Sequence, residues 1–289
     1  MKQRNDERNR MNEEGVAMKQ VESAVRIQEE PTALHPQLIN DKGRAQRQVP
    51  PMHVSQSLVT LAPAGAELDE KQRTMAEQFR VLRARVKSLS NDFQLRTILI
   101  TSALPGEGKT TVSANLAGTL SRIEGMRVLL MDLDLRQPNL HTVFGVEPDP
   151  RASSPLAGET SWQSSVYQVN RRLDVLFGFR PLEEPDRLLQ SNRLKNLLDE
   201  ARADYDVVII DSAPLLAVAD TQSVVPFVDC GLFVLNADAT PIAAAREALS
   251  MLRDKVVGCV VNRVKDLKSE NYYRKSGYGY GYGSNHTEN

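Results

Sequence analysis

Three short segments in the middle of the chain carry residue types that bind phosphate groups and magnesium. The first, residues 103–110, places two glycines beside a lysine and a threonine. Glycines allow backbone N–H groups to approach phosphate oxygens closely, a lysine supplies positive charge, and a threonine hydroxyl can ligate magnesium. We therefore predict a phosphate-binding loop for ATP, whose binding residues are Pro105, Gly106, Glu107, Gly108, Lys109, Thr110 and Thr111.

The surroundings of this segment agree with a phosphate-binding loop. It follows an apolar run, and it precedes a stretch with Val112, Leu116 and Leu120 on one helical face. The usual pattern begins with glycine, where this chain has Ala103, but the later glycines make the closest approach to phosphate. The alternative is a glycine-rich helix start without a ligand. The strand, loop and helix context favours the nucleotide site.

Carboxylates end the other two segments. Asp132 and Asp134 follow the apolar run that begins at Val128, and residues two apart on an extended chain point to the same side. Asp211 follows the apolar run that begins at Val207, which is the arrangement that holds the metal ion in phosphate-loop NTPases. Because ligands gather at the carboxyl ends of parallel strands, we expect the strand of Asp132 to neighbour the phosphate loop. The alternatives for these aspartates are a solvated turn and a helix cap. With Thr110, they are the predicted magnesium ligands.

The end of the chain carries most of its tyrosines. Five of the seven lie there, separated in part by glycines: Tyr272, Tyr273, Tyr278, Tyr280 and Tyr282. Glycine spacing predicts a flexible backbone with accessible phenols. Beside a phosphate cradle and magnesium carboxylates, this pattern indicates a protein that phosphorylates its own tyrosines. The alternative is a low-complexity tail with only adhesive or disordered character.

Between these motifs, short β-branched runs alternate with helical stretches. Strands that are apolar on both faces and joined by helices predict an α/β fold with a mostly parallel sheet, as in P-loop NTPases. The predicted strands are Arg96–Ser102, Arg127–Asp132, Leu173–Phe177, Val207–Asp211, Leu232–Asn236 and Val256–Asn262. The predicted helices between them are Lys109–Ile123, Pro185–Ala203 and Pro241–Asp254.

Composition divides the chain into three parts. Residues 1–66 are polar and contain several prolines, so we expect them to be disordered or loosely structured. Residues 67–264 form the predicted kinase domain, beginning with a helix over 67–89 that carries Met75, Phe79, Leu82 and Val86 on one face. Residues 265–289 form the predicted flexible tail.

Charge and hydropathy exclude other classes of protein. A net charge of −1 and a pI near 6.5 argue against a nucleic-acid partner. The two cysteines lie in apolar runs, which predicts buried thiols in a reducing compartment. The sequence has no apolar run long enough to span a membrane and no secretory signal, so we expect a cytoplasmic protein.

The motifs resemble those of the bacterial tyrosine kinases (BY-kinases) of exopolysaccharide and capsule export systems. The resemblance rests on residues 105–110, on Asp132, Asp134 and Arg136, on residues 211–214 and on the tyrosine cluster. It covers roughly two thirds of the chain, from about Glu77 to the C-terminus. One departure is Ala213, where the family more often has proline. The other is the missing membrane-spanning adaptor segment, which resembles the split arrangement in which a separate membrane protein activates a soluble kinase.

The resemblance implies further roles. Lys109, Asp132, Asp134 and Asp211 would be catalytic, and Asp132 would orient or deprotonate the attacking phenol, whose ordinary pKa is near 10. Asn262 resembles a position that contacts adenine in related ATPases, and a strand cap is the alternative for it. The family's oligomerisation helix resembles the pattern of Glu77, Arg80 and Arg83, which with Arg136 would form a ring of identical subunits. A solvated helix face is the alternative for this charged row.

The implied activity is protein-tyrosine autophosphorylation in trans that regulates exopolysaccharide chain length or export. A random coil from Arg263 to Tyr280 reaches on the order of 22 Å, which favours transfer to the tail of an adjacent subunit. The implied partners are a membrane chain-length determinant or co-polymerase adaptor, which recruits the kinase to the inner face of the membrane, and other tyrosine-containing proteins.

Two alternatives belong to other functional classes. Septum-positioning and partition ATPases share this fold, but their phosphate loop has an additional lysine where this chain has Leu104. A non-catalytic nucleotide-binding scaffold is the second alternative, with Ala103 and Ala213 as early signs of decay. Neither predicts phosphotyrosine after incubation with ATP and magnesium.

Overall fold

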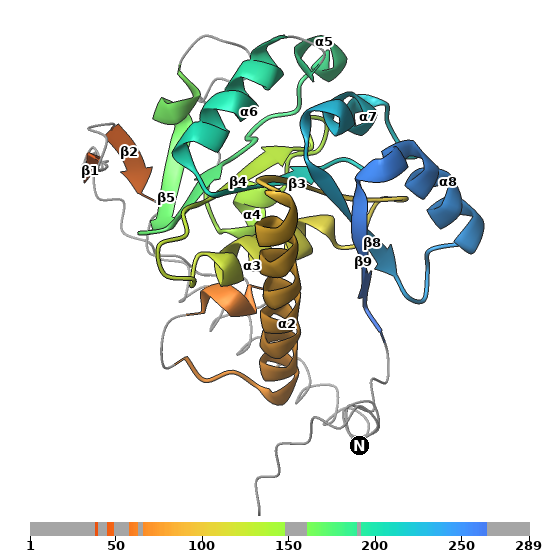
Figure 1. The fold of residues 1–289 in the computed structure, drawn as a ribbon, viewed down its shortest axis with the longest axis horizontal. Helices are drawn as coiled ribbons and strands as arrows, with labels where there is room; N and C mark the ends of the chain where they lie inside the picture. The colour runs from red at the N-terminus through yellow and green to blue at the C-terminus, as the bar shows by residue number, and fades with distance from the viewer. Residues whose placement is uncertain are drawn as a thin grey trace, which may run out of the picture. The chain divides into compact units, whose positions relative to one another are not determined.

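The computed structural model describes residues 38–39, 45–48, 58–62, 66–147, 161–189 and 192–264 (Figure 1). Its centre is a sheet with the strand order β1-β2-β5-β6-β4-β7-β3-β8-β9. From β6 to β9 every neighbouring pair is parallel, whereas β5 pairs antiparallel with β6 and β1 pairs antiparallel with β2. The strands are β1 (Leu38–Ile39), β2 (Ala45–Gln48), β3 (Thr97–Ser102), β4 (Val128–Leu133), β5 (Val166–Asn170), β6 (Leu173–Leu176), β7 (Val207–Ser212), β8 (Cys230–Asn236) and β9 (Val256–Asn262). The prediction of a mostly parallel α/β sheet is confirmed.

Helices cover both faces of this sheet (Figure 1). One face carries α2, α3 and α4, and the other carries α5, α6, α7 and α8. The α-helices are α2 (Glu70–Phe93), α3 (Lys109–Leu120), α4 (Leu140–Val143), α5 (Pro185–Leu189), α6 (Asn192–Asp204), α7 (Asp220–Val224) and α8 (Ile242–Leu252). Short 3₁₀ turns are η1 (Val59–Leu61), η3 (Trp162–Ser165), η4 (Val225–Phe227) and η5 (Arg253–Lys255). No helix in these ranges is apolar enough over a sufficient length to cross a bilayer.

The alternation of side chains along the central strands builds two hydrophobic cores. In β3, Ile98 and Ile100 point into the core under α3, and Leu99 points into the core under α6 and α8. The same alternation holds in β4 and β7, because successive side chains of a strand face opposite sides. Strands that are apolar on both faces are therefore required, and this is the pattern that the sequence shows.

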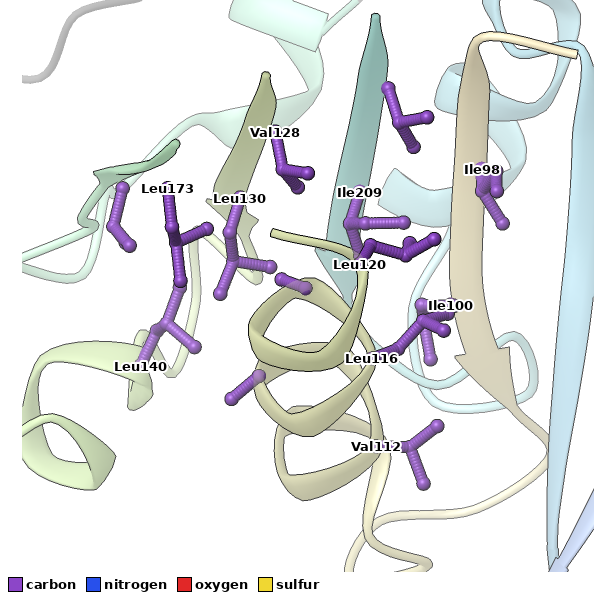
Figure 2. Close-up of a cluster of buried hydrophobic side chains, with 14 of the residues drawn as sticks. Ile98, Ile100, Val112, Leu116, Leu120, Val128, Leu130, Leu140, Leu173 and Ile209 are labelled. Carbon is purple, nitrogen blue, oxygen red and sulfur yellow. The ribbon is translucent and has the colours of Figure 1, made fainter. Parts of the chain in front are cut away.

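Helix α3 is the element that connects the sheet to the phosphate loop. Figure 2 shows Val112, Leu116 and Leu120 directed from α3 toward Ile100 and Ile209 of the central strands. This is the helical face predicted from the sequence, and burying it fixes where the first turn of α3 lies. The loop before that turn is thereby held at the carboxyl end of β3.

Helix α2 follows its predicted apolar face but is shifted along the chain, since it begins at Glu70 rather than at residue 67. Phe79 and Val86 are buried, and a capping box between Asp69 and Gln72 starts the helix. The helix continues past residue 89 to Phe93. The predicted helix Pro185–Ala203 is instead divided into α5 and α6. Helix α6 begins at Asn192, and asparagine favours helix starts over helix interiors.

Residues 58–62 lie within the stretch 1–66 that we expect to be disordered or loosely structured, and they pack on the domain. Leu58 and Val59 are buried in the core beside α2 and α3. The Thr60 hydroxyl donates to the Asn115 carbonyl over 2.9 Å, and the Thr60 amide donates to the Asn115 side-chain oxygen over 3.2 Å. Gly118 allows this approach, because a Cβ there would lie 2.6 Å from the Thr60 hydroxyl. Composition alone missed the contact because only a few residues make it.

This contact predicts an unusual effect of a helix-favouring substitution. Gly118→Ala should lower the free energy of unfolding by about 1–3 kcal/mol, because a new methyl group meets Thr60 and Leu61. Helix propensity alone would raise it by about 1 kcal/mol. Denaturant unfolding measures the change.

A double-mutant cycle supplies the control. When Thr60→Gly and Leu61→Ala remove the obstructing side chains, Gly118→Ala should become neutral or stabilising. An equal loss of stability in both backgrounds would show that residues 58–62 do not pack on α3 as described.

Candidate nucleotide and metal site

The site lies where the chain changes direction across the sheet. After β3 the chain crosses to β4 on one side, whereas β8 pairs with the other side of β3. Ligands of open α/β sheets bind outside the carboxyl ends of the strands at such a point. Strand β4 does not pair with β3. Strand β7 lies between them.

The phosphate loop between β3 and α3 has the backbone conformation that its glycines permit. Gly106 and Gly108 have φ values of +76° and +98°, which side-chain-bearing residues rarely adopt. A Cβ built at Gly106 would meet no atom within 4 Å, so the loop has open space beside it. Ala103 is fully buried and packs in the core, which explains why a small apolar residue serves at this position. The loop and the N-terminus of α3 fit a phosphate group.

Asp132 and Asp211 lie directly opposite each other on the neighbouring strands β4 and β7. Leu130 on β4 and Ile209 on β7 point into the core under α3. Asp132 follows Leu130 by two residues and Asp211 follows Ile209 by two, so both carboxylates lie on the same face and point toward α3. Asp132 is 4% exposed and Asp211 is 1% exposed. Two acids are thus held together with almost no solvent.

Hydrogen-bond donors surround these carboxylates. Asp132 accepts from the backbone amides of Leu140, over 3.1 Å, and of Asp134, over 3.2 Å. Asp211 accepts from the Ser113 hydroxyl over 2.9 Å and from the side chain of Thr110. These donors offset part of the cost of burying negative charge.

Burial sets the electrostatics of the site. It raises the pKa of Asp211 to about 6, against the hydrogen bonds from Thr110 and Ser113 and the charge of Lys109. Burial and the nearby Asp211 charge raise the pKa of Asp132 well above its usual range. The pKa of Asp134 is also raised by burial, and that of Lys109 is lowered by burial although Asp211 and Asp134 oppose the change. One cation thus faces several acids, and a divalent ion would neutralise the excess negative charge.

The donor set suits magnesium that also binds a nucleotide. Over the residues that the structure describes, no three His, Cys, Asp or Glu side chains are arranged to hold a metal ion by themselves. Magnesium in phosphate-transferring sites commonly takes only one or two carboxylates, with phosphate oxygens and waters completing its shell. Thr110 and the aspartates therefore fit the ion in the presence of phosphate.

Comparisons with known proteins agree with this geometry. The AAA domain family matches residues 95–227. The tyrosine-protein kinase YwqD of Bacillus subtilis is 38% identical over 209 residues, which cover 71% of this chain and 88% of YwqD. The kinase domain of the Escherichia coli tyrosine kinase ETK is 27% identical with a TM-score of 0.60, covering 72% of this chain and 80% of that domain. The chain belongs to the bacterial tyrosine-protein kinase family. The resemblance inferred from the motifs is confirmed.

Other relatives in the comparison are much longer than this kinase. The succinoglycan biosynthesis transport protein ExoP of Rhizobium meliloti is 30% identical over 233 residues. These cover 77% of this chain but only 29% of ExoP. The functions of the other parts of these longer relatives therefore cannot be assigned to this kinase.

Two predicted nucleotide-binding residues of the kinase have their side chains engaged with the protein. Glu107 accepts from the Leu104 amide over 2.9 Å and from the Thr240 hydroxyl. The Asn262 side-chain amide donates to the Glu107 carbonyl over 2.9 Å, and a Cβ at Gly108 would lie 2.1 Å from that amide nitrogen. Asn262 therefore supports the phosphate loop, and an adenine contact stays a prediction.

Sequence reasoning missed Ser113 and Thr240. Ser113 lies four residues after Lys109, one helical turn along α3, and this spacing could have indicated that it faces Asp211. Thr240 is distant in sequence from the phosphate loop, and no local signal marks it.

The residues predicted to form the ring interface do not meet in one cluster of contacts. Glu77 and Arg80 are exposed and pair over 2.6 Å on α2, and Arg83 donates to the Thr119 carbonyl over 3.3 Å. Arg136 forms a two-point ion pair with the buried carboxylate of Asp220, over 2.7 and 3.0 Å. That pair ties the segment after Asp134 to α7, and an intersubunit role stays a prediction.

The predicted acceptor tyrosines at positions 272–282 lie outside the described residues. The other two tyrosines of the kinase are both buried. Tyr205 donates its hydroxyl to Asp174 over 2.7 Å, and burial raises its pKa. Tyr167 packs edge-to-face against Phe177 and Phe179. Neither presents its phenol as a substrate in this fold.

The raised pKa of Asp211 predicts how stability depends on pH. A carboxyl group with a pKa of about 6 when folded and about 4 when unfolded binds its proton more tightly in the folded chain. The ionised Asp211 carboxylate therefore lowers the free energy of unfolding fully above about pH 6 and has no effect below about pH 4. Without magnesium or nucleotide, Asp211→Asn should be more stable than the wild type at pH 7.5 by up to about 3 kcal/mol, and the difference should shrink toward pH 4.5.

The matched control is an exposed carboxylate whose pKa is lowered rather than raised. Hydrogen bonding to Lys195 lowers the pKa of Asp199, so Asp199→Asn should give no stabilisation at pH 7.5. Urea unfolding at both pH values measures all three chains. A lower stability of Asp211→Asn at pH 7.5 would contradict the electrostatic description of the site.

Proposed function

We propose that this kinase binds ATP with magnesium and transfers the terminal phosphoryl group to tyrosines 272–282 of an adjacent subunit. The observation that carries this proposal is the position of Asp132 and Asp211 on adjoining strand ends, on the side of the sheet that α3 covers, with Lys109 beginning α3. This arrangement concentrates the charges that phosphoryl transfer requires in one buried place.

Each residue has a role that follows from its chemistry. The N–H groups of the loop and the Lys109 ammonium would bind the phosphates, and Thr110, Asp134 and Asp211 would hold the metal. Magnesium, when bound, neutralises phosphate charge and orients the reacting group. The pKa of Asp132 is raised, and two backbone amides hold its carboxylate in place. Both properties suit Asp132 to orient a phenol and accept its proton.

The position of the tyrosines supports the tail as the acceptor. The two tyrosines within the described domain are buried, so their modification would require local unfolding. The five tyrosines at 272–282 are the other phenols in the chain. Phosphates on several of them would each add roughly −1.5 to −2 charge and repel the acidic site, which would loosen the assembly.

The proposal extends to assembly and regulation. The exposed Glu77 and Arg80 of α2 leave this helix available to a second copy in a ring. We propose that a membrane chain-length determinant or co-polymerase adaptor recruits the kinase to the inner face of the membrane. Regulation of exopolysaccharide chain length or export then follows from the phosphorylation state. The name of ExoP, a succinoglycan biosynthesis transport protein, supports this part.

Mixing two complementary variants tests transfer between subunits. The donor has an intact site and phenylalanine at positions 272, 273, 278, 280 and 282. The acceptor carries Lys109→Ala and keeps its tyrosines. After incubation with ATP and magnesium, mass spectrometry should find phosphotyrosine on acceptor residues 272–282, and neither variant should acquire it alone.

Three results would count against the proposal. Phosphate on Tyr167 or Tyr205 would contradict the assignment of the acceptors. Phosphorylation of wild-type chains but not of mixed variants would contradict transfer in trans. ATP binding without any phosphotyrosine would favour the non-catalytic scaffold.

A further inference from the structure

The phosphate loop contains a carboxylate that points away from the site for phosphate. Glu107 is 3% exposed, and its side chain turns back to accept from the Leu104 amide of the same loop. A free carboxylate in this loop would repel a nucleotide phosphate, because the two negative charges would lie close together in a poorly hydrated site. A Glu107 carboxylate released from these hydrogen bonds would therefore oppose phosphate binding.

Thr240 provides the hydrogen bond that holds Glu107 from outside the loop. Its hydroxyl donates to the second carboxylate oxygen of Glu107 and accepts from the Asn236 amide over 2.8 Å. A hydroxyl has one proton, and because the Asn236 amide occupies a lone pair, that proton is directed to Glu107. The Thr240 amide also donates to the Asn236 carbonyl over 3.0 Å, so a closed turn fixes the position of the hydroxyl.

The same turn is tied to the end of β9. The Ala237 amide donates to the Asn262 carbonyl over 3.0 Å, and the Asn262 side chain donates to the Glu107 carbonyl over 2.9 Å. Glu107 is therefore held at its side chain by Thr240 and at its backbone by Asn262. Loop, turn and strand end form one connected network of hydrogen bonds.

We propose that Thr240 is a positioning residue that sets the phosphate loop for nucleotide binding by holding the Glu107 carboxylate out of the cradle. The proposal rests on the proposed ATP site and adds to it a residue outside the motifs. Thr240 is not among the residues proposed to contact the nucleotide, and it would act on the site through Glu107.

Replacing the hydroxyl with a methyl group of the same shape tests this role. In Thr240→Val, the affinity for ADP with magnesium should fall about tenfold to a hundredfold, the range expected for losing a hydrogen bond to a charged group. In the protein without ligand, hydrogen exchange of the Leu104 amide should accelerate by about tenfold or more, because Glu107 is no longer held in place to accept from it. Thr240→Ser retains the hydroxyl and should restore both values to within about twofold of wild type.

Thr97→Val is the matched control for a general loss of stability. Thr97 is a buried threonine whose hydroxyl oxygen accepts a hydrogen bond from the Asp229 amide. It lies at the start of β3, away from the phosphate loop. This variant should leave ADP affinity and Leu104 exchange unchanged.

Three results would overturn the proposal: wild-type behaviour of Thr240→Val, equal damage by Thr240→Ser and Thr240→Val, or the same loss in Thr97→Val. A wild-type chain that binds no ADP would refute the proposed function instead. The exchange rate of Leu104 would then still decide whether Thr240 holds the loop.

Discussion

Two buried carboxylates on adjoining strands define what the rest of this structure must achieve. Asp132 and Asp211 face each other across β4 and β7, and both are nearly inaccessible to solvent. Such a pair is unfavourable by itself, because each charge loses hydration and repels the other. The fold holds it in place with backbone amides, with hydroxyl groups from α3 and with the ammonium group of Lys109. The remaining excess of negative charge would favour a divalent cation at this site.

The two-layered core explains how the fold withstands this cost. Strands β3, β4 and β7 are apolar on both faces up to the residues that end them, so their register is fixed by burial rather than by the acids. Helix α3 packs along the same strands (Figure 2). The side chains of Thr110 and Ser113, in its first turns, donate hydrogen bonds to Asp211. Residues 58–62 add to this packing from outside the motifs, through the contacts between Thr60 and Asn115.

Much of this arrangement could be predicted from the sequence, because its signals are local. All six predicted strands exist with ends shifted by at most two residues, since each is a short run dominated by apolar residues. The phosphate loop and the acids follow from residue type and from their position after such runs. The family was predicted from the same residues and was confirmed by the comparison with known proteins.

What could not be predicted depends on contacts between distant parts of the chain. The sequence does not show that β7 lies between β4 and β3, so the pairing of Asp132 with Asp211 was unforeseen. Strand β5 was missed because it is short and half-polar, and it acquires its partners only in the folded sheet. Thr240 reaches Glu107 across more than a hundred residues, and threonine is too common for its type to have drawn attention. Arg136 meets Asp220 in the same way, through the packing of α7.

The most direct test of the central claim is the effect of magnesium on nucleotide binding, measured by calorimetric titration of ADP into the wild type and Asp211→Asn. If the acids and the phosphate loop form one site, magnesium should strengthen ADP binding to the wild type by about tenfold or more and to the variant by less than about twofold. An equal effect of magnesium on both chains would show that Asp211 does not hold the metal, and the site described above would be incorrect.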